Sequence, residues 1–201
     1  MNDLYTASIA QVSSDADVLA LQQKFNDGVL DVIAAIDVAT VTLARKDIVD
    51  ACHYLKGSCG YEQLIDLCGV DMSEYPEHDA HADRFYVVYH LLSVRCNKRI
   101  RLKVSLNERE WVDSVSEVWP TANWFEREAF EMYGIIFNHH PDLRRLLTDY
   151  GFDGHPMRKD FPVTGRTELF FDETQWRCVY RPNKVENREL TPKTWPGVDR
   201  G

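Results

Sequence analysis

The strongest constraint on the fold is a strict alternation of apolar and polar side chains along residues 100–106. Successive side chains of a β-strand point to opposite faces of a sheet, so this strand buries one face and leaves the other half exposed. Residues 84–93 are strand-like on both faces, and residues 94–97 can form the turn between the two strands. The alternating apolar residues are Ile100, Leu102, Val104 and Leu106. These patterns predict two adjacent strands of a sheet.

Apolar residues at helical spacing predict two helices in the first third of the chain. Ser14 and Asp15 can cap the first helix, which Gly28 can end. Residues 48–56 form the second helix, with Gly57 as its stop. The apolar positions are Val18, Leu21 and Phe25 in the first helix, and Ile48, Ala51, Cys52 and Leu55 in the second. Each helix therefore has one face that must be buried against another element.

The other segments of the first 120 residues fit the same class of fold. Residues 30–44 are rich in Val, Ile, Ala and Thr, and Asp37 divides them into two strand-like runs that can form a hairpin. Residues 61–70 are mixed in character. We therefore predict an α+β core domain over residues 1–120, in which a small mixed or antiparallel sheet packs against helices.

The remaining residues differ in composition from this core domain. Nearly all of the net negative charge lies in residues 1–120, whereas the rest of the chain is charge-balanced. We expect residues 121–181 to contain a helix followed by an irregular docking segment. Residues 182–201 contain three prolines and few large apolar residues, so they cannot build a core of their own. We predict an extended C-terminal tail that lies on another subunit.

Composition argues against several classes of function. The formal net charge of -9 and the pI near 5.2 are unlike those of a nucleic-acid-binding protein, which needs a basic face. The five cysteines form no C-x-x-C pair of the kind that holds zinc or an iron–sulfur cluster, so we expect reduced thiols in a reducing compartment. We find no secretory or transit peptide and no run approaching the roughly 18 apolar residues of a membrane span. Any membrane association is therefore expected to go through partners.

The loop of residues 71–83 is rich in carboxylates and histidines, which are ligands of divalent ions. A metal site also needs fixed geometry and second-shell support, and a polar loop containing proline does not promise either. A solvated acidic loop is therefore the favoured interpretation. The candidate ligands are Asp71, Glu74, Glu77, His78, Asp79, His81 and Asp83.

The segment from Trp124 to Gly165 is dense in residues with conformational or electrostatic roles. It overlaps a helix predicted from Ala122 to Tyr133, with Thr121 as a candidate N-cap and Gly134 in the left-handed C-terminal position. Phe125, Ala129 and Met132 form one apolar stripe along this helix.

Two His-Pro pairs follow the helix, each with a basic pair shortly after it. Proline fixes φ and biases the preceding residue toward extended geometry, so each His-Pro pair forms a stiff corner. The pairs are His140-Pro141 with Arg144-Arg145, and His155-Pro156 with Arg158-Lys159. Interleaved with them are Asp142, Asp149, Asp153 and Asp160. A long irregular loop that carries so many charges indicates a binding role.

The same residues raise two enzyme interpretations, and neither is favoured. The first is a metal site, but adjacent histidines on an extended chain point apart and no H-x-x-x-H helix pair is present. The second is an acid–base pair of Glu126 and Glu128, but residues two apart on a helix do not face each other. The candidate metal ligands are His139, His140 and His155 with Asp142 or Asp149.

The basic residues of the segment also allow two interpretations. Arg144, Arg145, Arg158 and Lys159 could cradle an anion, or they could pair with carboxylates of the loop or of a partner. Ion pairing is favoured because four aspartates are already nearby.

Several runs in this segment closely resemble the signature of the respiratory complex I 30 kDa subunit family. The resemblance is strongest over residues 124–165 and weaker but consistent over residues 38–119. The departures are Asn138-His139 before the first His-Pro pair, where a glycine is frequent, and Met157, where leucine is common. The matching runs are Glu126-Arg-Glu-Ala-Phe-Glu-Met-Tyr-Gly-Ile, His140-Pro-Asp-Leu-Arg-Arg-Leu-Leu, Asp149-Tyr-Gly-Phe and Gly154-His-Pro-Met-Arg-Lys-Asp-Phe-Pro.

This resemblance implies an α+β domain without a redox centre of its own and without catalytic residues. It places the chain in the peripheral arm of a proton-pumping NADH:quinone oxidoreductase, at the cytoplasmic side of the bacterial inner membrane. Its partners would be the 49 kDa (D) subunit and iron–sulfur subunits near the quinone site, with FMN and the clusters held by partner subunits. The signature residues, expected at an interface, are Glu126, Arg127, Gly134, His140, Asp142, Arg144, Arg145, His155, Arg158, Lys159 and Asp160.

Two alternatives remain open at this point. The chain could be the equivalent subunit of an NDH-type photosynthetic complex or of a membrane-bound hydrogenase, because other subunits determine the electron donor. It could also be a stand-alone metal-dependent enzyme that uses the acidic loop or the three C-terminal histidines.

Overall fold

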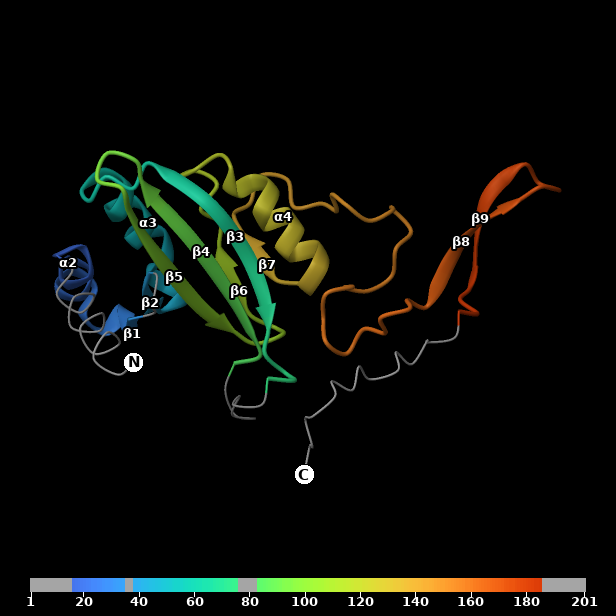
Figure 1. The fold of residues 1–201 in the computed structure, drawn as a ribbon, viewed down its shortest axis with the longest axis horizontal. Coiled ribbons are helices and arrows are strands. Elements are labelled where there is room, and N and C mark those ends of the chain that lie inside the picture. The colour runs from blue at the N-terminus through green and yellow to red at the C-terminus, as the bar shows by residue number, and fades with distance from the viewer. Residues whose placement is uncertain (1–15, 35–37, 76–82, 186–201) are drawn as a thin grey trace, which may run out of the picture. The chain divides into compact units, whose positions relative to one another are not determined.

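The computed structural model describes residues 16–34, 38–75 and 83–185. The chain forms two compact units, residues 1–159 and 160–201. The first unit contains the sheet and the helices, and the second contains a separate β-hairpin (Figure 1). The predicted capping residues Ser14 and Asp15 lie outside the described residues, as does most of the predicted tail.

A five-stranded mixed sheet forms the centre of the first unit, in the order β1-β2-β5-β4-β3. The strands are β1 (Val29–Ala34), β2 (Ala39–Leu43), β3 (Gln63–Asp71), β4 (Phe85–Ser93) and β5 (Lys98–Leu106). Neighbouring strands are antiparallel except for β2 and β5, which pair in parallel. Both predicted strand pairs are confirmed, because β1 pairs with β2 and β4 pairs with β5.

Strand β5 shows the predicted alternation, with an inner apolar face and a half-buried outer face. Its inner residues Ile100, Leu102, Val104 and Leu106 are at most 1% exposed. The mixed pattern of residues 61–70 does not predict β3, which is an edge strand. Polar Asp66 and small Gly69 interrupt its apolar pattern, and its register with β4 shifts between Leu64 and Asp66.

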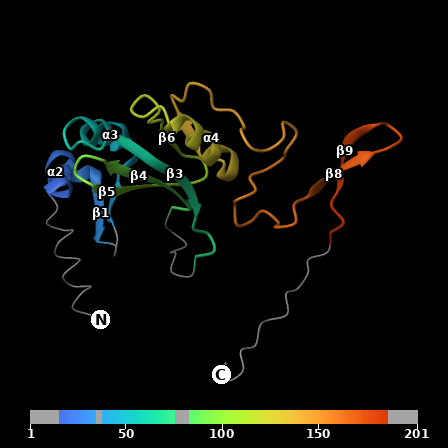
Figure 2. The same cartoon turned by 45° about the horizontal axis from the view of Figure 1, so that its top comes forward.

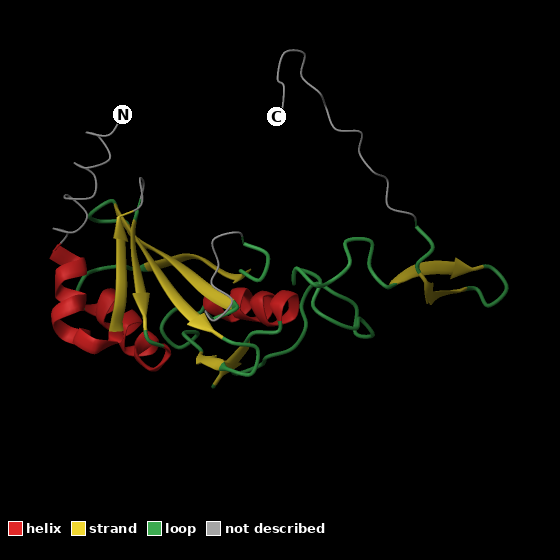
Figure 3. Cartoon of the chain, turned by 90° about the horizontal axis from the view of Figure 1, so that it is seen from below, coloured by secondary structure: helices red, strands yellow, loops and turns green. Residues whose placement is uncertain are grey.

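Within the described residues, three α-helices pack against the inner face of the sheet. They are α2 (Ala16–Phe25), α3 (Ile48–Gly57) and α4 (Ala122–Tyr133). Short 3₁₀ turns, η1 (Asn26–Gly28) and η2 (Arg45–Asp47), follow α2 and precede α3. All three helices contribute buried residues to the core cluster that contains the inner residues of β5, and Figure 3 shows them along one side of the sheet. The predicted α+β fold is thus confirmed.

Helix α4 spans the predicted residues Ala122–Tyr133, but the predicted side-chain cap at its start is not made. Gly134 has φ of +78° and its N–H donates to the carbonyl of Phe130, so it forms the left-handed C-terminal position. Thr121 stands at the N-cap position, but its backbone is helical and its side chain makes no capping hydrogen bond. After α4, strand β7 (Ile136–Asn138) pairs in parallel with β6 (Trp111–Asp113). The chain then continues as an irregular loop, coloured yellow to orange in Figure 2.

The second unit contains a hairpin of β8 (Thr167–Asp172) and β9 (Arg177–Pro182). The sequence predicts only an irregular docking segment here. Most side chains of this hairpin are exposed, so it lacks the alternation between a buried and a solvated face from which strands are predicted.

Candidate functional site

The residues with the clearest roles in the first unit lie on α4 and in the irregular loop after β7, which we call the signature loop (residues 139–159). Glu131 of α4 is fully buried, and its carboxylate accepts hydrogen bonds from the backbone N–H groups of Leu146 (2.6 Å) and Leu147 (2.8 Å). It also accepts from the N–H and the hydroxyl of Thr148. Burial alone raises the pKa of Glu131, but these hydrogen bonds outweigh it and lower the pKa to about 2.

Arg127, one helical turn before Glu131, binds backbone carbonyl groups of the same loop. Its guanidinium is buried and donates from Nε to the carbonyl of Arg144 (3.0 Å) and from Nη2 to the carbonyl of Arg145 (3.1 Å). Residues four apart lie on the same face of a helix, so Arg127 and Glu131 reach the same part of the loop. A buried cation and a buried anion thus bind carbonyl and N–H groups that have no sheet or helix partner.

Glu126 joins α4 to the segment after β6. It is fully buried and accepts from the backbone N–H of Val115 (2.7 Å) and from the hydroxyl of Ser114 (2.6 Å). Burial raises the pKa of this carboxyl to about 7, although the two hydrogen bonds act in the opposite direction. Glu126 is thus buried and bound to backbone and hydroxyl donors, whereas Glu128 is exposed, so the two do not form the acid–base pair.

His140 lies beside Glu126 and anchors the start of the signature loop. Its Nδ1 accepts from the backbone N–H of Asp142 (3.0 Å), which leaves Nε2 to donate to the carbonyl of Asn123 (3.1 Å). Nε2 also lies 3.8 Å from a carboxylate oxygen of Glu126, and neither side chain is exposed. The first His-Pro corner is therefore attached to the N-terminal turn of α4.

The second His-Pro corner attaches to the other end of the helix. His155 Nδ1 lies 2.8 Å from the carbonyl of Glu131, and Arg158 Nε donates to the carbonyl of Tyr133 (2.6 Å). These carbonyls belong to the last turn of α4, where cations and donors are favoured. A Cβ on Gly134 would lie 2.5 Å from Arg158 Nη2 and 2.7 Å from His155 Nε2, so these side chains fill the space above the glycine.

Asp71, at the end of β3, holds the end of the signature loop. It accepts from the backbone N–H of Lys159 (3.0 Å) and from two nitrogens of Arg84 (3.1 and 2.8 Å). Burial raises its pKa, but the hydrogen bonds from Arg84, Lys159 and Ser73 lower it well below the usual range. Asp71 therefore has a defined role in the fold.

The structure divides the predicted site residues into two groups. Side chains that hold the loop are buried or half-buried: Glu126, Arg127, His140, Arg145, His155 and Arg158, with Gly134 beneath them. Exposed side chains are Asp142, Arg144, Lys159 and Asp160. Predicted ion pairing is confirmed for Arg144 with Asp142 (2.7 Å), whereas Arg145 and Arg158 donate to backbone carbonyls.

In the structure, the histidines proposed as metal ligands contact other groups of the protein. His139 lies 3.2 Å from Asp113, whereas His140 and His155 bind opposite ends of α4. No group of three or more potential ligands is placed to hold a metal within residues 16–34, 38–75 and 83–185. Residues 76–82 of the acidic loop lie outside these ranges.

The sequence patterns do not single out Glu131 as a site residue. The sequence does contain a pattern that could have identified Glu131. It lies four residues after Arg127, on the same face of a helix whose other face is apolar. Asp71 has no comparable signal, since its partner Lys159 lies 88 residues away.

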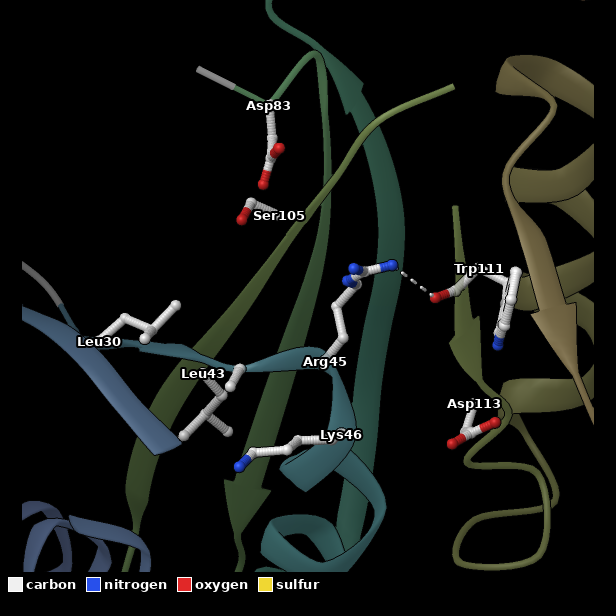
Figure 4. Close-up of a pocket in the computed structure, with 9 residues that line it drawn as sticks. Leu30, Leu43, Arg45, Lys46, Asp83, Ser105, Trp111 and Asp113 are labelled. Carbon is white, nitrogen blue, oxygen red and sulfur yellow. Dashed lines mark hydrogen bonds between the residues drawn. The ribbon is translucent and has the colours of Figure 1, made fainter. Parts of the chain in front are cut away.

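A separate cavity of about 520 Å³ lies between the end of β2 and β6 (Figure 4). Arg45 reaches into it and pairs with Glu110 (2.7 Å), and its Nη1 lies 3.5 Å from the carbonyl of Trp111. Lys46 and Asp113 also line the cavity. The cavity therefore presents both charge signs beside exposed apolar groups.

The solved structures that share this fold include the following two. Nqo5, as a trypsin-resistant fragment (1-134), is 28% identical in sequence to this chain and matches it with a TM-score of 0.56. The match covers 63% of this chain and 98% of that chain. A chain of the membrane-bound sulfane sulfur reductase (MBS), an archaeal respiratory membrane complex, is 19% identical with a TM-score of 0.58, covering 72% of this chain and 83% of that one. The second likeness concerns the fold alone.

The chain belongs to the family described as "Respiratory-chain NADH dehydrogenase, 30 Kd subunit", whose model matches residues 41–167. Its relatives include the C subunit of the NADH-quinone oxidoreductase of Polaromonas sp. (strain JS666), 50% identical over 83% of this chain and 84% of that protein. The C subunit of the Methylobacterium radiotolerans enzyme is 49% identical over 94% of this chain and 89% of that protein. The C subunit of the Hydrogenovibrio crunogenus enzyme is 44% identical over 86% of this chain and 91% of that protein. The predicted family is confirmed.

Membership in this family makes the chain a subunit of NADH-quinone oxidoreductase and implies other complex I subunits as its partners. Among the described residues, no helix combines the length and apolar character that a membrane crossing requires.

Proposed function

We propose that the chain is a cofactor-free structural subunit of the peripheral arm of a proton-pumping NADH:quinone oxidoreductase. It docks on the 49 kDa (D) subunit and on neighbouring iron–sulfur subunits, and it supports electron transfer from NADH to quinone. FMN and the iron–sulfur clusters belong to those partners. The complex holds the chain at the cytoplasmic side of the bacterial inner membrane. The relatives from NADH-quinone oxidoreductases favour this assignment over a photosynthetic or hydrogenase complex.

The observation that carries the proposal is a loop fixed from beneath with apolar side chains facing outward. Arg127 and Glu131 bind the backbone of residues 144–148 from inside the protein. The side chains of Leu147 and Tyr150 are 63% and 95% exposed. Exposed apolar side chains on a rigid support are typical of interfaces, because docking them costs little ordering entropy.

The cofactor-free part of the proposal is supported by how the ionisable residues are used. Glu126, Glu131 and Asp71 each accept hydrogen bonds from backbone N–H groups, and His140 and His155 each contact a backbone carbonyl. These groups therefore have structural roles in the free chain. Metal and flavin analysis of the purified chain tests this point, and stoichiometric zinc, iron, manganese or flavin would contradict it.

Docking is tested by purifying the complex through a tag on this chain. Leu147→Ser combined with Tyr150→Ser is expected to reduce the 49 kDa subunit that co-purifies, because both anchors are lost. Val94→Ser is the matched control, since Val94 is 57% exposed but lies in the turn between β4 and β5. Unchanged co-purification of the 49 kDa subunit with the double variant would overturn this docking surface. If the wild-type chain itself does not co-purify with that subunit, the proposed partner is wrong.

A further inference from the structure

A pocket of about 320 Å³ lies between α4 and the edge strand β3, and Met157 of the signature loop forms part of its wall. We call it the α4–β3 pocket. Its shape depends on Gly69, because a Cβ there would lie 2.5 Å from Cδ2 of Tyr133. The aromatic ring of Tyr133 thus packs directly on the strand. The backbone N–H of Met157 donates to the carbonyl of Met132 (3.1 Å), which fixes the loop over the end of the helix.

Sulfur-containing side chains supply much of the apolar lining. Met132, Met157 and the half-buried Cys68 all line the pocket. Thioether groups are polarisable, and unbranched methionine adapts its rotamers to the shape of its neighbours. Such a lining accommodates a long flexible side chain better than it accommodates a flat ring of fixed shape.

The charged residues of the pocket are both acidic. Asp66 of β3 and Glu128 of α4 line it, and no cation among the described residues does so. Within the described part of the chain, neither carboxylate forms a hydrogen bond or an ion pair. Arg101, which does not line the pocket, lowers the pKa of Cys68. Burial, Asp66 and Glu128 raise that pKa and prevail.

A large exposed aromatic side chain lies on α4 beside the pocket. Trp124 lies one turn before Glu128 on α4 and is 65% exposed. An exposed tryptophan one turn from Glu128 offers a ring face beside a counter-charge to a cationic side chain. The net charge of -9 also favours the approach of a basic surface.

We propose that the α4–β3 pocket receives a lysine or arginine side chain from a partner subunit. Its aliphatic stem packs against Met132 and Met157, and its charged head lies between Asp66 and Glu128. Basic side chains bury their stems on apolar surface in this way while the head keeps polar partners. This inference rests on the proposed docking function, and it adds a specific contact beside the exposed anchors of the signature loop.

The first test measures how strongly the chain stays in the purified complex as the salt concentration is raised. Asp66→Asn with Glu128→Gln preserves the shape of the pocket and removes its charge. We expect about a tenfold weaker retention per carboxylate, and a smaller dependence on salt. Asp50→Asn with Glu74→Gln is the matched control, because both residues are exposed carboxylates away from the pocket. Equal retention of the two double variants would overturn the proposal.

The second test measures peroxide oxidation of Met132 and Met157 by mass spectrometry, in the free full-length chain and in the complex. We expect both methionines to be protected in the complex and less protected when the two pocket carboxylates are neutralised. Equal oxidation in the free chain and in the complex would overturn the proposal. Protection already present in the free chain, and lost on deletion of residues 186–201, would assign the pocket to the chain's own C-terminal residues and overturn it as well.

These outcomes are distinct from a failure of the proposed function. If the wild-type chain does not co-purify with the 49 kDa subunit, the docking function itself is wrong. If it does co-purify while the pocket methionines stay fully oxidisable, docking stands and the assignment of the pocket is wrong.

Discussion

Arg127 and Glu131 lie one turn apart on α4, and their buried side chains bind opposite kinds of backbone group in the same short stretch of loop. Arg127 donates to the carbonyls of Arg144 and Arg145, and Glu131 accepts from the N–H groups of residues 146–148. Each buried charge is surrounded by the backbone dipoles it requires. This arrangement replaces the regular hydrogen bonding that an irregular loop lacks.

Replacing Glu131 by Gln should destabilise the chain. The amide keeps one acceptor oxygen, but its NH₂ group then faces buried N–H donors, and a buried unsatisfied group costs about 2–3 kcal/mol. Urea unfolding at neutral pH measures the change in the free energy of unfolding. Glu128→Gln is the control on the same helix, where exposure limits the expected effect to about 0.5 kcal/mol. Equal stability of the two variants would show that Glu131 does not hold the loop.

Two arginines of the signature loop should respond differently to alanine substitution. Arg158→Ala removes a hydrogen bond to the last turn of α4 and a guanidinium 5.0 Å from the ring of Phe85, so we expect a loss of about 1–3 kcal/mol. Arg144 is exposed and pairs with exposed Asp142, so Arg144→Ala should change stability by about 0.5 kcal/mol or less. Thermal unfolding of both variants tests this difference. A stability loss for Arg144→Ala as large as for Arg158→Ala would contradict it.

The fold could be predicted from the sequence where local patterns and burial agree. The alternation in β5 and the periodicity of α3 are retained in the structure because one face of each packs on the core. Strand β3 could not be predicted because Asp66 and Gly69 interrupt its apolar pattern. The β8–β9 hairpin could not be predicted either, because most of its side chains are exposed, so it shows no apolar periodicity.

The candidate site could be located from the sequence, but the roles of its residues could not be assigned. The density of His-Pro corners and charges correctly marks residues 124–165 as a structurally special segment. Whether Arg144 or Arg158 faces solvent depends on how the loop returns to α4, which spacing along the chain does not reveal. The link from Asp71 to Lys159 is likewise a tertiary contact without a local pattern.

Gly134 should be intolerant of even a small side chain. Its φ of +78° is costly for alanine, and the added Cβ would lie within 3 Å of both Arg158 and His155. We expect Gly134→Ala to lose about 1–3 kcal/mol of stability, measured by thermal unfolding. Gly57→Ala provides the comparison, because a Cβ on Gly57 would have no atom within 4 Å and alanine favours a helix. A neutral Gly134→Ala would mean that the loop moves freely from the helix end.

The buried carboxyl of Glu126 should make stability depend on pH near neutrality. Its pKa is raised from 4.5 to about 7, so between these values the folded chain keeps a proton that the unfolded chain has released. Stability therefore falls as the pH rises through this window, by roughly 3 kcal/mol in full. Glu131 acts in the opposite sense at lower pH, because its lowered pKa makes stability fall as the pH drops from 4.5 toward 2.

His155 also titrates near this window, and its contribution has the other sign. Burial lowers its pKa below 6.5, so its neutral form favours folding and stability is lost as the pH falls. The contribution of Glu126 is isolated by measuring urea unfolding from pH 5 to 8 for the wild type and for Glu126→Gln. The advantage of the wild type should shrink as the pH rises toward 7 and then level off, because below pH 7 only the folded wild type keeps a proton that its unfolded state has released. A constant difference across the range would mean that Glu126 does not change its protonation state there.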